Sequence, residues 1–402
     1  MGRSAPAMLL IALLASACDE GSPVTSPLEC DRDPLLPGCT PEPPVFPGLS
    51  APLEIVRDDS GVVHVLGETD ADVYYGSGYM QAFDRLFEME MTRRRALGTR
   101  AEVLGPDYFD DDRLTRVVDI RHWGEVNAAA ILRSDPSQYA LLAAWCAGVN
   151  ALLIDIAEGR VPMPPEMTEL GIVPEPWTPA DAMAVGKLIV FGNANQLEYD
   201  ILSSIIAQYL PGLDARLPLL RPVRDTFTLP EDERPEPVRT SLAAPPPSAP
   251  VPMPSDARAR LARFSALFED FRSGGSNNWA IDGSRTDTGR PIIAGDPHQP
   301  LRSPSLFWAH HMRARSGALD VVGFSFVGTP SIQLGHNRRI AWTATTTYPD
   351  IMDIWSVRVT GDPATGAVRS VFVGGEEAPV RLRTETSLVA GEEPREIVVE
   401  EV

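Results

Sequence analysis

The sequence predicts an α+β fold, in which helices predominate in the first half and strand pairs follow a proline-rich boundary. Three observations lead to this fold class. Alternating patterns at 53–58 and 62–66 predict a strand pair, and apolar residues at three- and four-residue spacing predict a helix over 70–97. Beyond the boundary, Ser276 opens a second strand-like run, and a turn leads from it to an apolar run at 291–294.

Length and composition place the chain among globular proteins. Its 402 residues can bury a large core in two domains or in one large domain. Apolar residues make up 44% of the chain, which is too many for disorder, and the 39 prolines indicate long irregular connections. The formal net charge of -20 argues against nucleic acid as a partner, because a phosphate backbone is bound by clustered Lys and Arg.

Residues 1–18 have the form of a signal sequence for export. A single positive charge, Arg3, precedes an apolar run over 8–14 that is too short to span a bilayer. The following Leu-Ala-Ser-Ala-Cys resembles a bacterial lipoprotein cleavage site, so Cys18 is expected to carry lipid chains that tether the protein to a membrane surface. The alternative is ordinary cleavage at the Ala-x-Ala site. Both interpretations place the protein in the periplasm or cell envelope.

Residues 19–50 predict a flexible tether, since proline, serine, glycine and acidic residues dominate and periodicity is weak. Cys30 and Cys39 flank a proline-rich loop within it and are candidates for a disulfide in an oxidising compartment. Cys146 lies in an apolar run and is expected to be a buried thiol. No cysteine spacing in the sequence indicates zinc.

The helix over 70–97 is expected to bury one face. Met80, Phe83, Phe87 and Met91 recur at three- and four-residue spacing, and a face of this kind ordinarily belongs to the core. Basic residues gather near the end of the helix, where they complement its dipole. Three charged residues of this helix are interpreted as solvated or salt-bridged rather than catalytic: Arg85, Glu88 and Glu90.

Two further helices are expected before the boundary. The first covers 138–156, and the second runs from the Thr178 region through Phe191. Thr178 is the expected N-cap of the second helix, because a proline follows at the first helical position and Asp181 stands three residues after the cap.

The segment 231–275 is expected to be a spacer or propeptide. Its proline-rich part is unable to form a packed element, and an amphipathic helix over 256–271 then leads directly to Ser276. This segment separates a region over 51–230 from a second region over 276–402.

Several motifs in these regions match a known family. They are, in order, IVRD at 55–58, GVVHV at 61–65, GYMQAFDRLFEME at 78–90, RRALG at 94–98 and AEVLG at 101–105. After the spacer, Ser276 follows a glycine and precedes Asn-Asn-Trp. With these motifs the chain resembles the penicillin acylase (penicillin amidase) family of N-terminal nucleophile hydrolases from about Leu53 to Trp355. The resemblance implies a four-layer αββα core with a largely helical α-chain region.

The resemblance also implies that the precursor cuts its own chain between Gly275 and Ser276. Gly275 permits the close, strained backbone approach that such a step needs. Ser276 would attack the preceding carbonyl, and its freed α-amine would afterwards act as the base for its hydroxyl. An α-amine with a pKa of about 7.7 to 8 is partly neutral near physiological pH, so it suits this role. The mature serine would then hydrolyse a linear amide through an acyl-enzyme.

Supporting roles follow from the same family pattern. The backbone N–H of Thr346 would stabilise the oxyanion, and the second donor is an asparagine that this sequence does not contain, because it stops within the family's β chain. His298 is expected to position groups by hydrogen bonding, the alternative being a buried histidine satisfied by backbone. His336 is interpreted as structural, in a hairpin turn. His310 and His311 point in different directions and are not expected to share an ion.

One calcium ion is expected near the end of the matched region. The carboxylates of Asp350 and Asp353 and the carbonyl of Met352 are hard oxygen ligands of the kind that calcium prefers. The family binds calcium at this Asp-x-x-Asp motif with help from an acid of the α chain. Asp200 is the expected counterpart, with Glu198 as the alternative. A solvated turn is the competing interpretation of the motif.

The predicted function is hydrolysis of a linear amide, such as a β-lactam side chain or an acyl-homoserine lactone. The expected partners are this small-molecule substrate and the α and β chains of one precursor, with a membrane contacted only through the lipid. Two alternatives remain open: a truncated, inactive fragment, and a non-catalytic surface lipoprotein on an acylase scaffold. A sheet that stops early would expose unpaired edges, so aggregation of a chain of this length is also expected.

Overall fold

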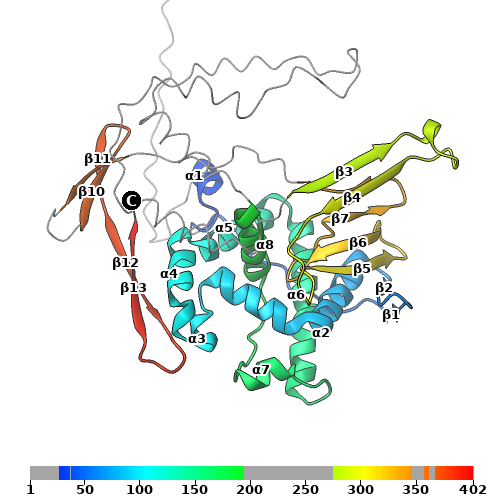
Figure 1. Cartoon of the computed structure of the whole chain (residues 1–402), viewed down its shortest axis with the longest axis horizontal. Helices are drawn as coiled ribbons and strands as arrows, with labels where there is room; N and C mark the ends of the chain where they lie inside the picture. The colour runs from blue at the N-terminus through cyan, green and yellow to red at the C-terminus, as the bar shows by residue number, and fades with distance from the viewer. Residues whose placement is uncertain (1–26, 37, 194–274, 346–356, 362–366, 402) are drawn as a thin grey trace, which may run out of the picture.

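The computed structural model describes residues 27–36, 38–193, 275–345, 357–361 and 367–401 (Figure 1). Helices dominate the part of the chain before residue 194, and strands dominate the part after residue 274. The predicted α+β class is therefore confirmed. The segments 1–26 and 194–274, which include the predicted signal sequence and the predicted helix over 256–271, lie outside the described residues.

The described helices are α1 (Pro27–Arg32), α2 (Asp70–Leu97), α3 (Ala101–Leu104), α4 (Phe109–Val118), α5 (Ile120–Ser134), α6 (Pro136–Ala157), α7 (Pro165–Glu169) and α8 (Pro179–Asn193), with short 3-10 turns at Pro106–Tyr108 and Gly283–Arg285. The described strands are β1 (Glu54–Arg57), β2 (Val63–Gly67), β3 (Ser276–Ile281), β4 (Ile292–Pro297), β5 (Phe307–Ala314), β6 (Asp320–Phe326), β7 (Leu334–Asn337), β8 (Ala341–Trp342), β9 (Arg358–Gly361), β10 (Val368–Val373), β11 (Glu376–Pro379), β12 (Arg381–Ser387) and β13 (Arg395–Glu401).

A six-stranded mixed sheet joins the two halves of the chain. Its strand order is β1-β2-β5-β6-β7-β8, and only the β2–β5 pair is parallel. The antiparallel β1–β2 pair confirms the predicted strand pair, with Val56 opposite His64. The parallel pair sets His64 beside His311, so strands from before and after Ser276 belong to one sheet. The β3–β4 hairpin projects beyond this sheet, as Figure 1 shows.

Helix α2 covers one face of the sheet and confirms the predicted helix over 70–97. Thr69 and Asp72 form a capping box at its start, and Gly98, with φ 66°, closes its end in the left-handed region. The buried face consists of residues such as Ala82, Leu86 and Met89. The sheet and this helix layer form two layers, and the four-layer arrangement stays a prediction.

The predicted core face of α2 is wrong at one position. Phe83 is 53% exposed, whereas Met80, Phe87 and Met91 are partly buried and pack against the core. The buried positions Gly78, Ala82, Leu86, Met89 and Arg93 keep three- and four-residue spacing through the non-helical Arg85, and they lie on a stripe next to the one that was predicted. The packed face therefore follows Leu86 and its buried neighbours instead.

The charged residues of α2 form ion pairs, as predicted. Glu90 is 1% exposed and lies between Arg93 and Arg94, which bind its two carboxylate oxygens at 2.5 and 2.9 Å. Arg85 pairs with Glu88 at 2.8 Å. Burial raises the pKa of Glu88, and the Arg85 guanidinium opposes this shift.

Helix α6 crosses α2 in close backbone contact. A Cβ atom at Gly148 would lie 1.9 Å from the Tyr75 carbonyl oxygen, so only glycine allows this approach. Cys146 is buried in the same helix, as predicted. Among the described helices, α6 alone is long and apolar enough to span a membrane, and its buried residues, including Trp145, belong to the protein core.

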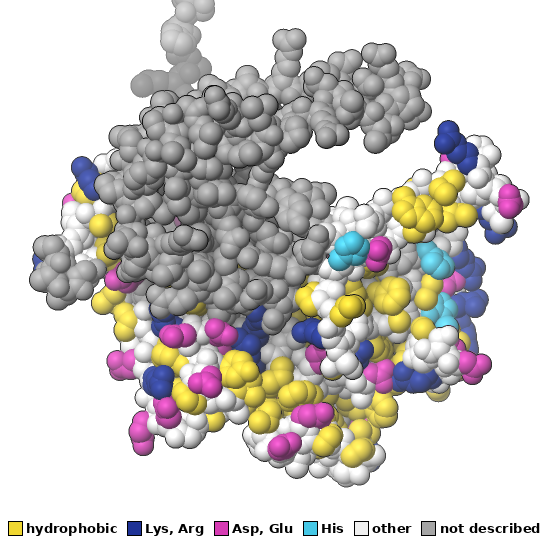
Figure 2. Space-filling model, in the orientation of Figure 1, with side chains coloured by type: hydrophobic (Ala, Val, Ile, Leu, Met, Phe, Trp, Pro, Cys, Tyr) yellow, Lys and Arg dark blue, Asp and Glu magenta, His cyan; other side chains and the backbone are white. Residues whose placement is uncertain are grey.

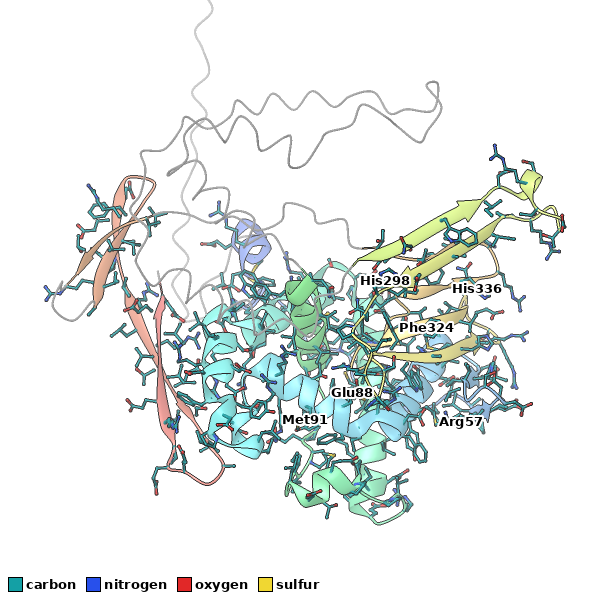
Figure 3. All side chains as sticks on the ribbon, in the orientation of Figure 1. Arg57, Glu88, Met91, His298, Phe324 and His336 are labelled. Atoms are coloured by element: carbon teal, nitrogen blue, oxygen red, sulfur yellow. A yellow bond between two sulfur atoms is a disulfide. The ribbon has the colours of Figure 1, made fainter. Side chains whose placement is uncertain are left out.

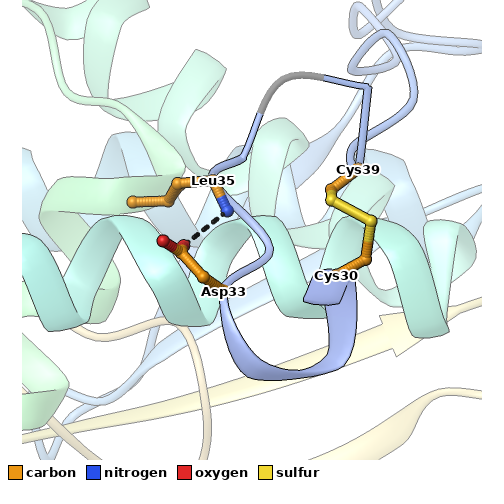
Figure 4. Close-up of a disulfide and its surroundings, with 4 residues drawn as sticks. All are labelled: Cys30, Asp33, Leu35 and Cys39. Atoms are coloured by element: carbon orange, nitrogen blue, oxygen red, sulfur yellow. Dashed lines mark hydrogen bonds between the residues drawn. A yellow bond between two sulfur atoms is a disulfide. The ribbon is translucent and has the colours of Figure 1, made fainter. Parts of the chain in front are cut away.

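The predicted start of α8 and the predicted disulfide are both confirmed. Thr178 and Asp181 form the predicted capping arrangement, because each backbone N–H donates to the other residue's side chain. The predicted disulfide between Cys30 and Cys39 is also present (Figure 4). Helices α3, α4 and α5 were not among the sequence-based expectations.

The histidine on the helix-facing side of the sheet is fully buried. His310 has no exposed surface, stacks on Trp308 with ring centroids 4.4 Å apart, and neither ring nitrogen hydrogen-bonds within the described residues. Burial disfavours the charged imidazolium and lowers the pKa of His310 to about 4. This histidine is therefore neutral in the folded protein near pH 7.

Stability is expected to fall on acidification because of His310. The unfolded chain binds a proton here near the ordinary pKa of 6.5, whereas the folded chain resists protonation until about pH 4. Neutral His310 therefore contributes to the free energy of unfolding, and this contribution is complete above pH 6.5. As the pH falls from 6.5 to about 4, the contribution decreases by about 1.4 kcal/mol per pH unit. His310→Phe should flatten the pH dependence of the unfolding free energy over this interval, as measured by denaturant titration. Identical slopes for the two proteins would contradict the assignment.

Candidate active site

The hairpin of β3 and β4 places Ser276 at the first position of a strand. Ser276 lies opposite Pro297, and Asn277 lies opposite Asp296 in an unbroken antiparallel register. Ser276 is half-buried, while most of the following strand is exposed. The strand predicted from the sequence therefore begins at the proposed nucleophile, which is held by strand pairing.

The peptide between Gly275 and Ser276 has polarising contacts on its carbonyl. The Ser276 hydroxyl donates to the Gly275 carbonyl oxygen at 2.8 Å. The backbone N–H of His298 lies 3.3 Å from that oxygen and 3.4 Å from Ser276 Oγ. Gly275 has φ 139°, a conformation that side chains rarely adopt. The serine oxygen and a backbone donor thus meet at the bond that the family pattern predicts to break.

The His298 side chain is a partly exposed neighbour of this peptide. Its Nε2 lies 3.0 Å from Asp296 Oδ2 and 3.3 Å from Asn277 Nδ2. Because the side chain is 41% exposed, the alternative of a buried histidine satisfied by backbone is wrong. Hydrogen bonding by this side chain fits the expected positioning role, whereas its backbone N–H is the group in contact with the Gly275 carbonyl.

The segment after β8 lies directly against the hairpin. The Thr345 hydroxyl donates to the Ser276 carbonyl oxygen at 3.2 Å, and Thr343 Oγ1 lies 3.3 Å from the Asn278 side-chain amide. A Cβ atom at Gly295 would lie 1.5 Å from Thr343 Oγ1. This packing holds the segment against the hairpin as far as Thr345. Thr346 lies outside the described residues, so its oxyanion role stays a prediction.

A cavity of about 880 Å³ opens beside the hairpin. Pro297, the strand partner of Ser276, contributes to its wall. Figure 2 shows hydrophobic side chains gathered where the hairpin meets the sheet, and Figure 3 labels three of the lining residues, Arg57, Phe324 and His336. His336 lies on β7 rather than in the turn that was predicted. Apolar side chains such as Phe307, Phe324 and Trp342 line the cavity together with polar ones, so part of the wall can hold a hydrophobic group.

Three charged residues, Arg57, Asp84 and Arg85, are part of the lining of this cavity. Arg57 binds Asp84 at 2.6 Å, and Asp84 accepts a hydrogen bond from the Trp308 indole at 2.9 Å. Arg85 donates to the Ser305 carbonyl oxygen at 2.9 Å. These contacts join β1, α2 and β5 around the cavity, and they keep both guanidinium groups occupied.

The remaining predicted site residues lie outside the described residues: Cys18, Asp200, Asp350, Met352 and Asp353. Within the part of the chain that the structure describes, no group of three or more His, Cys, Asp or Glu side chains is arranged to hold a metal ion. Calcium binding at the Asp-x-x-Asp motif therefore stays a prediction.

Two groups at the site were missed by sequence reasoning. One is the His298 backbone N–H, and the other is the Thr345 hydroxyl. Residue type cannot reveal a backbone donor, because every residue except proline carries one. The run of three threonines after Trp342 was the only available signal for the second group.

A strand that opens with serine after a glycine of positive φ fits the class of N-terminal nucleophile hydrolases. Residues 52–402 match the model of the penicillin amidase family. The chain therefore belongs to the penicillin amidase family, as its motifs indicated.

Individual relatives agree with this assignment. The chain is 32% identical to the penicillin acylase 2 proenzyme of Pseudomonas sp. strain SE83, covering 89% of this chain and 43% of that protein. It is 30% identical to the acyl-homoserine lactone acylase QuiP of Pseudomonas aeruginosa, covering 88% and 40%, respectively. The chain thus spans about two fifths of the length of these relatives.

A solved structure also matches part of the chain. It is the thermostable penicillin G acylase from Alcaligenes faecalis in its tetragonal form, at 30% sequence identity. The match covers 46% of this chain and 98% of that chain, with a TM-score of 0.36.

Gly295→Ala should separate the 343–345 segment from the hairpin. The added methyl would overlap Thr343 Oγ1, so the contact between Thr345 and Ser276 should weaken or break. Amide hydrogen exchange measured by mass spectrometry should become faster over 341–345 and stay unchanged over 54–67, which serves as the internal control. Unchanged exchange at both places would show that the segment does not depend on this close packing.

Proposed function

We propose that this chain belongs to a self-cleaving amidohydrolase precursor in which Ser276 becomes the N-terminal nucleophile. The observation that carries the proposal is the pair of contacts on the Gly275 carbonyl oxygen, one from the Ser276 hydroxyl and one from the His298 backbone N–H. Membership of the penicillin amidase family supports the same reaction class.

The first reaction is an acyl shift within the chain. Ser276 Oγ attacks the Gly275 carbonyl carbon and loses its proton, and the C–N bond of the peptide breaks as the serine nitrogen takes a proton. The result is an ester between Gly275 and Ser276. The His298 N–H supports the oxyanion of the intermediate, because it already points at this oxygen. Water then hydrolyses the ester and frees the Gly275 carboxylate and the Ser276 α-amine.

The second reaction uses the new α-amine. It accepts the Oγ proton while Oγ attacks the substrate amide, and it returns a proton to the departing amine. Water then releases the acid from the acyl-enzyme. We assign one oxyanion donor to the backbone N–H of Thr346. The contact between Thr345 and Ser276 supports this assignment, since it holds the preceding residue beside the nucleophile.

The substrate is proposed to be a linear amide with a hydrophobic acyl group. The apolar residues of the cavity wall, such as Phe307, Phe324 and Trp342, support such a group, and the polar residues that line the same cavity support contact with the polar atoms of the substrate. Relatives named penicillin acylase and acyl-homoserine lactone acylase provide the two substrate classes to compare.

We also propose how the precursor is exported, divided into regions and completed by a metal ion. The chain would be exported through residues 1–18, tethered by lipid at Cys18, and divided into regions 51–230, 231–275 and 276–402. Calcium bound by the Asp350–Asp353 motif would complete the site.

The donor on the scissile carbonyl can be tested by a matched pair of variants. His298→Pro removes the backbone N–H, so cleavage after Gly275 should slow by about a hundred- to a thousandfold. His298→Ala keeps that N–H and should retain most of the cleavage rate. The fraction of cut chain over time, measured by denaturing gel, gives both rates. Equal rates in the two variants would contradict the role of the backbone donor.

The nucleophile is tested by Ser276→Ala. This variant should lose hydrolysis of chromogenic acyl anilides entirely, because both the hydroxyl and the cut that exposes the α-amine are lost. Ser284→Ala, which alters a nearby serine of the hairpin turn, is the control and should keep the activity. Hydrolysis by the Ser276→Ala variant at the normal rate would remove Ser276 as the nucleophile.

A further inference from the structure

Two histidines form a pair on the six-stranded sheet, outside the β3–β4 hairpin that carries Ser276. His64 on β2 and His311 on β5 are register partners in the parallel pair, and their Nδ1 atoms are 3.1 Å apart. The two residues are 247 positions apart in the sequence. Their side chains are 31% and 20% exposed, so a small ion can reach them.

In each histidine, the ring nitrogen that faces away from the partner histidine, Nε2, contacts a carboxylate. His64 Nε2 lies 3.2 Å from Asp58 Oδ2, and His311 Nε2 lies 3.0 Å from Asp320 Oδ1. Asp58 is fixed by two backbone N–H groups of its turn, and Asp320 is fixed by Arg338 at 2.5 Å. Both carboxylates are therefore held in place by neighbours other than the histidines.

These carboxylates determine which ring nitrogen carries the proton. An ionised carboxylate only accepts hydrogen bonds, so Nε2 of each ring must be the donor. In the neutral form of each histidine, Nδ1 then presents a lone pair. Two lone pairs facing each other at 3.1 Å repel unless a cation lies between them. The arrangement therefore calls for a positive charge shared by His64 and His311.

We propose that His64 and His311 bind a divalent first-row transition ion, such as Zn²⁺ or Cu²⁺, through their Nδ1 atoms. Two nitrogens bound to one tetrahedral zinc at about 2.0–2.1 Å lie roughly 3.3 Å apart, close to the observed separation. Imidazole nitrogens suit these ions, and a carboxylate on the second ring nitrogen is the usual support for a ligating histidine. Water would complete the coordination, because the described residues provide no third His, Cys, Asp or Glu ligand.

The histidines that are adjacent in the sequence do not form this pair. His310 and His311 are adjacent, and the structure agrees that they do not share an ion, because His310 is buried against Trp308 on the helix-facing side of the sheet. The partner of His311 comes instead from β2. Only the parallel pairing of β2 with β5 brings His64 to it.

The test is metal binding by the chain, purified without a histidine tag and treated with a chelator. Zn²⁺ is titrated by calorimetry, and Cu²⁺ is added for electron paramagnetic resonance, which detects nitrogen ligands. The wild-type chain should bind one ion, and the copper spectrum should show two coordinated nitrogens. His64→Gln and His311→Gln should each lose the binding, whereas His122→Gln and His336→Gln should retain it.

Asp320→Asn tests the positioning role of the carboxylate. It should weaken Zn²⁺ binding by about 10- to 100-fold while leaving the two-nitrogen copper signal in place. If the wild-type chain binds no ion, or binds it equally well after both His64 and His311 are replaced, the proposal is overturned and a shared proton supplies the positive charge. Neither result affects the proposed reaction at Ser276, since the readout is binding alone.

Discussion

The parallel pairing of β2 with β5 is the interaction on which the rest of the structure depends. It joins a strand that precedes the Gly275–Ser276 peptide to one that follows it. The main hydrophobic core also combines residues from before and after this peptide, because Val63 and Val65 pack in one cluster with Trp308 and Met312. A cut before Ser276 would therefore leave both fragments held by shared sheet hydrogen bonds and by a shared apolar core.

Close backbone packing sets the position of the proposed nucleophile. Pairing of β3 with β4 fixes Ser276 opposite Pro297, which directs the next backbone N–H at the Gly275 carbonyl. Gly295 then lets the Thr343–Thr345 segment lie directly on the hairpin. The site is thus built mainly from main-chain groups, which reposition less readily than long side chains and so favour preorganisation.

Local signals in the sequence predicted much of the fold and the centre of the site. The capping box of α8, the alternation in β1 and β2, and the Gly-Ser step before a strand were all readable, because each depends on near neighbours. Phe83 was misplaced, because apolar residues occupy two neighbouring stripes of α2 and the buried stripe follows Ala82, Leu86 and Met89. The contact of His64 with His311 could not be predicted either, since it requires the register of two strands from distant parts of the chain. The hydrogen bond from the His298 backbone N–H to the Gly275 carbonyl could not be predicted for a similar reason: the direction of this N–H depends on the hairpin and not on residue type.

The most direct test is intact-mass analysis of the purified chain combined with N-terminal sequencing. We expect two fragments that remain associated under native conditions, and the second fragment should begin at Ser276 with Asn277 as its next residue. Such a result would establish that the Gly275–Ser276 bond breaks and that Ser276 becomes an N-terminal residue. A chain that stays uncut at Gly275 under folding conditions, or one that is cut at another bond, would contradict the account.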